Sequence, residues 1–187
     1  MIELTKTGID GLDDILNGGI VNNSTTLVSG NPGAGKSILG LQYIYNGIEQ
    51  FGEKGIFLSF EENTEDLRQA AESIGLENWG QHVADGNITV YDKQVLLREN
   101  DFSSSLELLL NELDGENYER LVLDSLTMFK LFFETEREQR TYLLKFTDIL
   151  ADNGLTTLMT NEQGTVFPET DISLENFLTD GNIYLLQ

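Results

Sequence analysis

The chain has 187 residues, which is enough for one domain with its own core and too short for two substantial ones. Hydrophobic residues make up 40% of the chain and charged residues 23%, which is typical of a globular protein and excludes disordered and collagen-like classes. Asp and Glu number 32 against 11 Lys and Arg, so the formal net charge is −21. Such a surface repels phosphate backbones and anionic lipids, which disfavours general binding to nucleic acids or membrane surfaces.

The excess of acidic residues has two interpretations. It is either an ordinary solvated surface or the surface of a halophilic protein, in which molar salt screens the repulsion between carboxylates. The size of the excess favours the halophilic interpretation.

The sequence contains no cysteine, so disulfides, thiol nucleophiles and cysteine zinc sites are excluded and any metal must bind through oxygen ligands. Residues 1–10 show no basic segment followed by an apolar stretch, and charges such as Asp124 and Lys130 interrupt the apolar runs. We therefore expect neither a signal peptide nor a membrane span, and a cytoplasmic location.

Short apolar runs rich in β-branched residues alternate with longer segments of helical spacing, which is the pattern of repeated βαβ units. The runs are short and continuous, as in strands that are buried on both faces. The sequence predicts an α/β fold with a mostly parallel central sheet and helices on both faces. The expected strands are Thr25 to Ser29, Ile56 to Phe60, Ile88 to Tyr91, Leu121 to Asp124, Leu155 to Thr160 and Ile183 to Leu186.

Four segments between these strands have helical spacing and recognisable ends. One runs from Ile38 to Ile48 and is expected to stop at Gly52, and a shorter one follows Asn63 or Thr64 and stops at Gly75. The pairs Ser104 with Glu107 and Thr135 with Glu138 have capping-box spacing and predict helices over 106–113 and 136–150, the latter stopped by Gly154. Residues 164–171 are predicted to form a functional loop.

The most specific pattern is GxxxxGK[ST], which lies between a predicted strand and a predicted helix. Its glycines allow backbone N–H groups to converge, and the helix N-terminus adds partial positive charge, so the segment is suited to bind phosphate. The lysine should reach the β and γ phosphates, and the serine hydroxyl should bind Mg²⁺. The alternative is a glycine-rich turn that only caps the helix. The pattern comprises Gly30, Asn31, Pro32, Gly33, Ala34, Gly35, Lys36 and Ser37.

Acidic residues follow two of the predicted strands, at the sheet edge where the phosphate loop must also lie. Asp124 fits a metal-side carboxylate, and Glu61 and Glu62 could orient or deprotonate a water. Their alternatives are a strand-ending cap and a solvated acidic turn. Asn161, at a third strand end, is either a γ-phosphate sensor or a turn residue, and His82, with no partner evident in the sequence, is expected at the surface.

Motifs along nearly the whole chain resemble the KaiC family, a branch of the RecA-like P-loop ATPases. The resemblance implies one RecA-like ATP-binding domain over residues 1–187. It also implies that Lys36 and Ser37 bind phosphate and metal, that Asp124 supports Mg²⁺ and that Glu61 and Glu62 are catalytic. Members of this family commonly form hexameric rings with ATP between subunits. The resemblance rests on residues 7–20, the phosphate loop, 42–47, 59–62, 123–126, 156–162 and 178–181.

The sequence departs from this family in two respects. The protein that names the family has two such domains, and the family domain continues into a hairpin whose basic residues reach the neighbour's γ-phosphate. This sequence stops at Gln187, before that hairpin, so slow hydrolysis is expected. Arg137 and Arg140 are candidate substitutes for the missing cation.

Two functions follow from the sequence. The first is a Mg²⁺-dependent ATPase with slow turnover in signalling or regulation. The alternative is a nucleotide-gated module that binds an unknown partner protein without significant turnover. DNA strand exchange is disfavoured because no basic strip interrupts the acidic surface. ATP is inferred here from the family resemblance.

Overall fold

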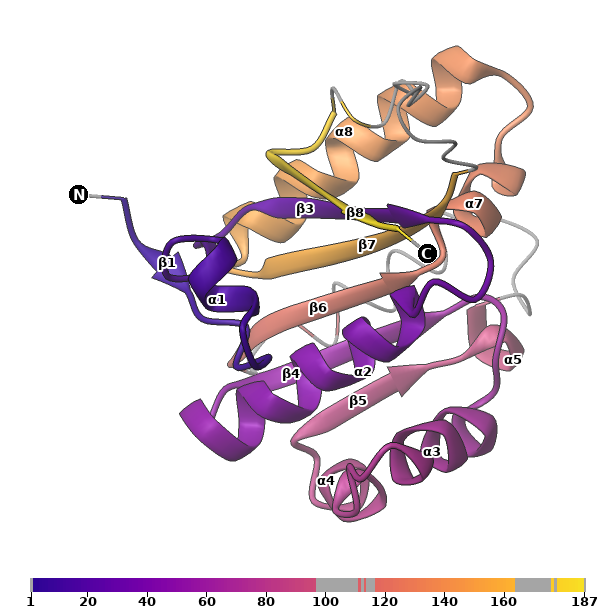
Figure 1. Ribbon diagram of the computed structural model, residues 1–187. Coiled ribbons are helices and arrows are strands. Elements are labelled where there is room, and N and C mark those ends of the chain that lie inside the picture. Colours follow the sequence, from indigo (N-terminus) through magenta and orange to yellow (C-terminus); the bar gives the residue numbers. More distant parts are fainter. Residues whose placement is uncertain are drawn as a thin grey trace.

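The computed structural model describes residues 2–96, 111, 113, 117–163, 176 and 178–186. Its centre is a six-stranded sheet with the order β5-β4-β6-β7-β3-β8, in which every neighbouring pair is parallel (Figure 1). Because the strands are parallel, all six end at the same edge of the sheet. The strands are β3 (Thr25–Gly30), β4 (Lys54–Ser59), β5 (Ile88–Tyr91), β6 (Tyr118–Asp124), β7 (Thr156–Glu162) and β8 (Gly181–Leu185).

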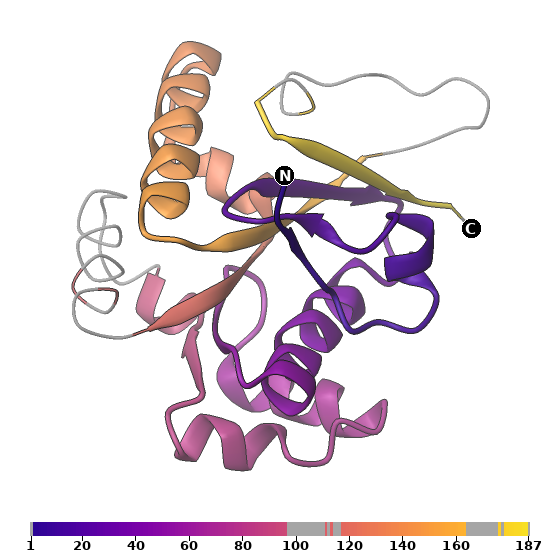
Figure 2. The ribbon, with the colours of Figure 1, turned by 90° about the vertical axis from the view of Figure 1, so that its left-hand side faces the viewer.

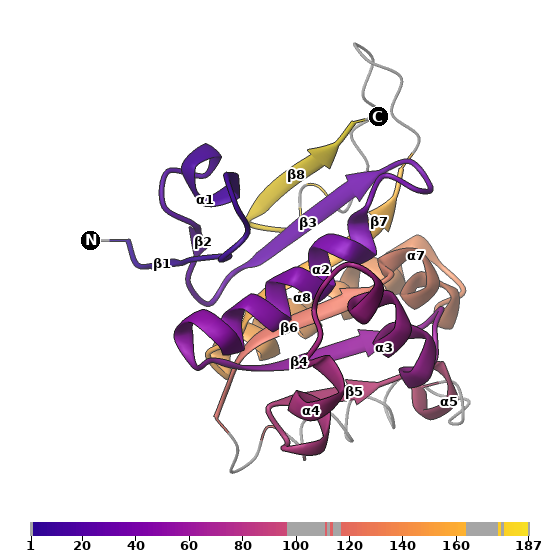
Figure 3. The same ribbon diagram turned by 60° about the horizontal axis from the view of Figure 1, so that its bottom comes forward.

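Helices cover both faces of this sheet, as Figures 2 and 3 show. The face nearer the viewer in Figure 3 carries α2 (Lys36–Asn46), which continues as the π-helical turn η1 (Gly47–Phe51), together with α3 (Thr64–Ser73) and α4 (Trp79–Ala84). The opposite face carries α8 (Glu136–Asp152).

The two hydrophobic cores follow from the alternation of side chains along each strand. In β6, Val122 packs with the α2 and α3 side, whereas Leu121 and Leu123 pack with α8. All three side chains are fully buried. The continuous apolar runs in the sequence therefore reflect strands with a core on each face, as predicted.

The remaining elements are short. The N-terminal segment forms a two-stranded antiparallel hairpin that encloses α1 and stands apart from the main sheet (Figure 1). This hairpin consists of β1 (Leu4–Thr5), α1 (Leu12–Ile15) and β2 (Ile20–Val21). The others, at the carboxyl ends of β5 and β6, are α5 (Lys93–Leu96), α7 (Leu126–Phe129) and the 3-10 turn η2 (Lys130–Phe132).

Helix boundaries match the predicted signals where the structure describes them. The Asn63 side chain accepts a hydrogen bond from the Asp66 N–H and is therefore the cap of α3, which decides between the two candidates. Thr135 and Glu138 form the predicted capping box of α8. The predicted helix over 106–113 and the loop over 164–171 lie almost wholly or wholly outside the described residues.

Within the described part of the chain, no helix combines the length and the apolar character that crossing a membrane requires.

Candidate functional site

The phosphate loop connects the end of β3 to the start of α2 at the carboxyl edge of the sheet (Figure 1). Gly35 caps α2 with a φ of 92°, a left-handed conformation that favours glycine. At Gly30 a Cβ would lie 2.8 Å from the Leu185 carbonyl oxygen, so glycine is needed there for close packing against β8. A glycine-rich turn at the N-terminus of a helix is suited to bind an anion through main-chain N–H groups.

Lys36, the first residue of α2, is nearly buried at 8% exposure and folds back over the loop. Its Nζ donates hydrogen bonds of 3.0 Å to the main-chain oxygens of Gly30 and Asn31. The ammonium is therefore held above the loop by neutral acceptors, which phosphate oxygens can replace with stronger, charge-assisted bonds.

Asp124 ends β6 and lies within reach of the start of α2. Its carboxylate accepts a hydrogen bond from the Thr160 hydroxyl, and the residue is 5% exposed. Burial raises the pKa of Asp124, and the nearby hydroxyls of Thr160 and Ser37 oppose that rise. A buried carboxylate beside a serine hydroxyl fits Mg²⁺. Proteins usually bind this ion through the oxygens of one or two carboxylates together with substrate phosphates.

Glu61 and Glu62 come one residue after the end of β4 and line the same cavity as Asp124. The Glu61 Oε1 accepts a 2.6 Å hydrogen bond from the Ser125 hydroxyl, and the Glu62 N–H donates to Ser59 Oγ at 3.0 Å. Burial raises the pKa of Glu62, and the negative charge of Asp124 adds to that effect. Glu62 thus binds a proton more readily than an ordinary glutamate does.

These residues share one cavity of about 350 Å³. Lys36, Ser37, Glu61, Glu62 and Asp124 all line it, so the structure brings the cationic, metal-side and acidic candidates together. The other lining residues are Pro32, Gly33, Gly35, Ile38, Leu41, Ala70, Ser125 and Glu162.

Three loop residues and Asn161 do not line this cavity. Gly30, Asn31 and Ala34 belong to the loop itself, where the first two supply the carbonyls that hold Lys36. Asn161 is 3% exposed, and its Oδ1 accepts a 3.4 Å hydrogen bond from the Thr127 hydroxyl.

Glu162 also lines the cavity, although no sequence pattern assigned it to the site. This residue ends β7, pairs in register with Gly30, and its N–H donates to Thr127 Oγ1 at 3.1 Å. Its position one residue after Asn161, at a strand end, was the available signal. His82, expected at the surface, is partly buried, and its Nε2 lies 2.8 Å from the Glu49 Oε1.

Arg137 and Arg140, the candidate substitutes for a missing cation, are exposed on the first turns of α8 and do not line the cavity.

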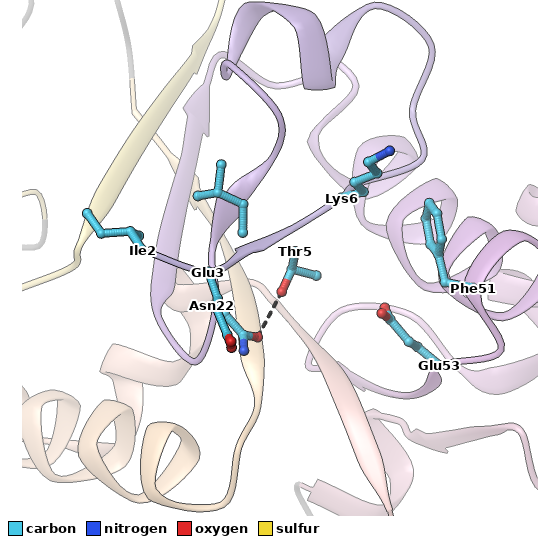
Figure 4. A pocket seen from close by; sticks show the side chains of 8 residues that line it. Ile2, Glu3, Thr5, Lys6, Asn22, Phe51 and Glu53 are labelled. Atoms are coloured by element: carbon cyan, nitrogen blue, oxygen red, sulfur yellow. Dashed lines mark hydrogen bonds between the residues drawn. The ribbon is translucent and has the colours of Figure 1, made fainter.

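A second, larger hollow of about 630 Å³ lies beyond the amino ends of β3 and β4, beside the N-terminal segment (Figure 4). Several of its polar groups already have partners. Thr5 donates to Asn22 at 2.9 Å, and Glu53 pairs with Arg120. It also contains none of the predicted site residues. Its lining residues are Ile2, Glu3, Leu4, Thr5, Lys6, Asn22, Phe51 and Glu53.

The sequence also matches a known family over almost its whole length. Residues 5–187 match the family model described as "ATPase: KaiC". The chain belongs to the KaiC family of ATPases. This confirms the resemblance that the motifs indicated.

Two relatives of different length, both longer than this chain, match most of it. The circadian clock oscillator protein KaiC of Acaryochloris marina is 32% identical over 188 residues, which cover 96% of this chain and 36% of that protein. The UPF0273 protein PF1931 of Pyrococcus furiosus is 32% identical over 174 residues, which cover 87% of this chain and 69% of that protein. The chain thus spans well under half the length of the curated circadian KaiC proteins that it matches.

A solved structure of the KaiC family has the same fold. The crystal structure of the KaiC-like protein PH0186 of Pyrococcus horikoshii OT3 aligns with a TM-score of 0.82 and 32% identity. The alignment covers 98% of this chain and 81% of that chain. The predicted RecA-like fold with a mostly parallel sheet is therefore confirmed.

Proposed function

We propose that the chain binds Mg·ATP at the phosphate loop and hydrolyses it slowly. The observation that carries this proposal is the convergence of Lys36, Ser37, Asp124 and the Glu61–Glu62 pair on one cavity. Membership of an ATPase family supports ATP as the nucleotide. A loop that merely capped α2 would not require carboxylates from other strand ends beside it, one of them the buried Asp124.

Each group has a distinct role in this proposal. The loop amides and Lys36 bind the β and γ phosphates, and Ser37 and Asp124 would hold Mg²⁺. Mg²⁺, when bound, neutralises charge on the phosphate oxygens. Glu62 orients a water and accepts its proton as the water oxygen attacks the γ-phosphorus, while the bond from that phosphorus to the bridging oxygen of ADP breaks.

The division of labour between the two glutamates follows from their contacts. The Glu61 carboxylate is engaged by the Ser125 hydroxyl. Glu62 has the raised pKa, which suits a base that must take up a proton near neutral pH. We therefore assign the base role to Glu62 and a supporting role to Glu61.

Slow turnover is proposed from the charge of the cavity. Among the described lining residues, Lys36 is the one cation, against the four acids Glu61, Glu62, Asp124 and Glu162. A second cation at the γ-phosphate accelerates phosphoryl transfer by several orders of magnitude in related chemistry. A site with one cation should therefore work slowly unless another copy of the chain or a partner supplies a second.

Steady-state phosphate release with Mg·ATP in concentrated KCl tests this function. Lys36→Ala should abolish nucleotide binding, whereas Glu62→Gln should retain binding and lose about a hundredfold in kcat. Glu136→Gln, which removes an exposed carboxylate of α8, is the matched control and should leave kcat unchanged. Wild-type release no faster than that of Lys36→Ala would rule out catalysis.

The same experiment separates the alternative function. Calorimetric binding of Mg·ATP without phosphate release would favour a nucleotide-gated module in signalling, read by a partner protein. Light scattering with and without Mg·ATP would report whether the nucleotide joins copies of the chain, as expected for a composite site between subunits.

A further inference from the structure

The segment that carries Glu61 and Glu62 is held in place by the end of a neighbouring strand. Asp92 follows β5 directly, and its side chain reaches Thr64, the first residue of α3. The Asp92 Oδ2 accepts two hydrogen bonds of 2.8 Å, one from the Thr64 N–H and one from the Thr64 hydroxyl. Asp92 is 7% exposed, so these bonds lie largely out of water.

The other oxygen of Asp92 fixes the carboxylate itself. Its Oδ1 accepts hydrogen bonds from the N–H groups of Gln94 at 2.9 Å and Val95 at 3.3 Å. One carboxylate therefore joins the end of β5, the start of α5 and the start of α3.

Lys93 contacts the same segment from its other end. Its Nζ donates a 3.0 Å hydrogen bond to the main-chain oxygen of Glu61. The backbone is thus bound on both sides of Glu62, at residue 61 by Lys93 and at residue 64 by Asp92. These two neighbouring residues directly follow β5.

These bonds exceed what α3 needs as a helix. Asn63 already caps α3 by accepting the Asp66 N–H at 2.9 Å. Thr64 is the first residue of the helix, where an N–H group is normally satisfied by water or a cap. A buried carboxylate brought from 28 residues further along the chain is an additional constraint on the position of this backbone.

We propose that Asp92 and Lys93 are positioning residues, which fix the backbone of residues 61–64 so that the Glu62 carboxylate faces the γ-phosphate. This inference rests on the proposed ATPase function. Its physical basis is that catalysis depends steeply on the placement of the reacting groups, so a small displacement of the base lowers kcat without weakening phosphate binding. Neither residue lines the cavity.

Two conservative variants test the positioning role. Thr64→Val removes the hydroxyl bond to Asp92 at constant shape, and Lys93→Met removes the bond to Glu61 while keeping an unbranched side chain. We expect each to lower kcat by about tenfold or more, while the Kd for Mg·ADP stays at the wild-type value. Thr64→Ser, which restores the hydroxyl, should recover turnover.

Thr135→Val is the matched control. It is the same substitution at the cap of α8, which packs on the opposite sheet face, so it lowers stability without touching residues 61–64. Its kcat should equal the wild-type value at a temperature where all variants are folded. Wild-type kcat in both Thr64→Val and Lys93→Met would overturn the proposal.

Hydrogen exchange provides a readout that does not need turnover. Amide protons of residues 61–64 should exchange faster in Thr64→Val and Lys93→Met than in the wild type, and at the wild-type rate in Thr135→Val. Unchanged exchange in the first two variants would overturn the positioning role whatever the activity. Faster exchange in a chain that does not release phosphate would retain this role and reject the proposed function instead.

Discussion

Arg120 is a charged side chain that is completely buried near the start of a strand. Its Nε bonds to Glu53 at 2.6 Å, and its guanidinium also donates to the main-chain oxygens of Lys6, Thr7 and Tyr43 at 2.7 to 3.3 Å. Planar, multidentate donation of this kind is particular to arginine. Arg120 therefore joins the N-terminal segment, the last turn of α2 and the start of β4.

Replacing Arg120 by Met should destabilise the chain substantially. The variant keeps the aliphatic bulk but leaves three carbonyls and the half-buried Glu53 carboxylate without their partner. We expect a loss of about 3 kcal/mol in the free energy of unfolding, measured by urea titration.

Arg68→Met is the matched control for this prediction. Arg68 also binds two carboxylates, Glu65 and Glu72, but on the exposed surface of α3, where water and salt weaken ion pairs. Its loss should cost much less than the loss of Arg120. Equal destabilisation by the two variants would contradict the role of burial.

At the scale of elements, local sequence patterns predicted the strand limits and helix caps, because these features depend on residues close together in the sequence. The six strands appear within three residues of their predicted limits, because a run buried on both faces leaves a continuous apolar signature. The capping residues Asn63 and Thr135 were also predictable from local sequence, because a cap binds a backbone N–H group only three residues away.

Contacts between distant segments were not predictable in this way. The helical segment ends at Gly52 as predicted, but its last turn is π-helical from Gly47, where a Cβ would lie 2.4 Å from the buried Arg120 Nε. Asp92 and Glu162 gain their places only when β5 and β7 align beside β4 and β3. The phosphate loop, by contrast, is a local sequence pattern and was recognised in full.

Asp92 also makes the start of α3 sensitive to pH. Burial alone would raise the pKa of Asp92, but hydrogen bonds from Thr64, Gln94 and Val95 to its ionised form outweigh burial and lower the pKa. A carboxyl whose folded pKa lies below its unfolded value stabilises the fold above the unfolded pKa of about 3.9. That contribution is lost as the pH falls through the folded pKa.

Asp92→Asn should therefore remove part of the acid sensitivity. The difference in unfolding free energy between wild type and variant should be constant near neutral pH and shrink below about pH 4. Urea titrations across this range measure it. A difference that stays constant down to acid unfolding would contradict the low pKa of Asp92.

At the scale of the whole molecule, the formal net charge of −21 acts on both stability and nucleotide binding. Like charges repel in the compact state more than in the unfolded chain, so low salt disfavours folding. The same field repels Mg·ATP, which is itself anionic, from a cavity where four acids face one lysine. Salt should therefore favour the folded state and speed nucleotide association.

The halophilic interpretation predicts that the free energy of unfolding rises with KCl up to molar concentration. Screening is the expected cause, because the Debye length falls to about 3 Å at 1 M.

The double variant D148K/D152K separates screening from general salt effects on hydrophobic burial. It places positive charge on the exposed face near the C-terminal end of α8, where cations are also favoured by the helix dipole. The variant should be more stable than wild type in dilute buffer and show a shallower rise with KCl, while sucrose should stabilise both equally. Parallel KCl dependences in the two proteins would mean that charge repulsion does not set the salt requirement. A halophilic surface would be excluded if the wild type kept the same near-UV circular dichroism spectrum and unfolding free energy without added salt.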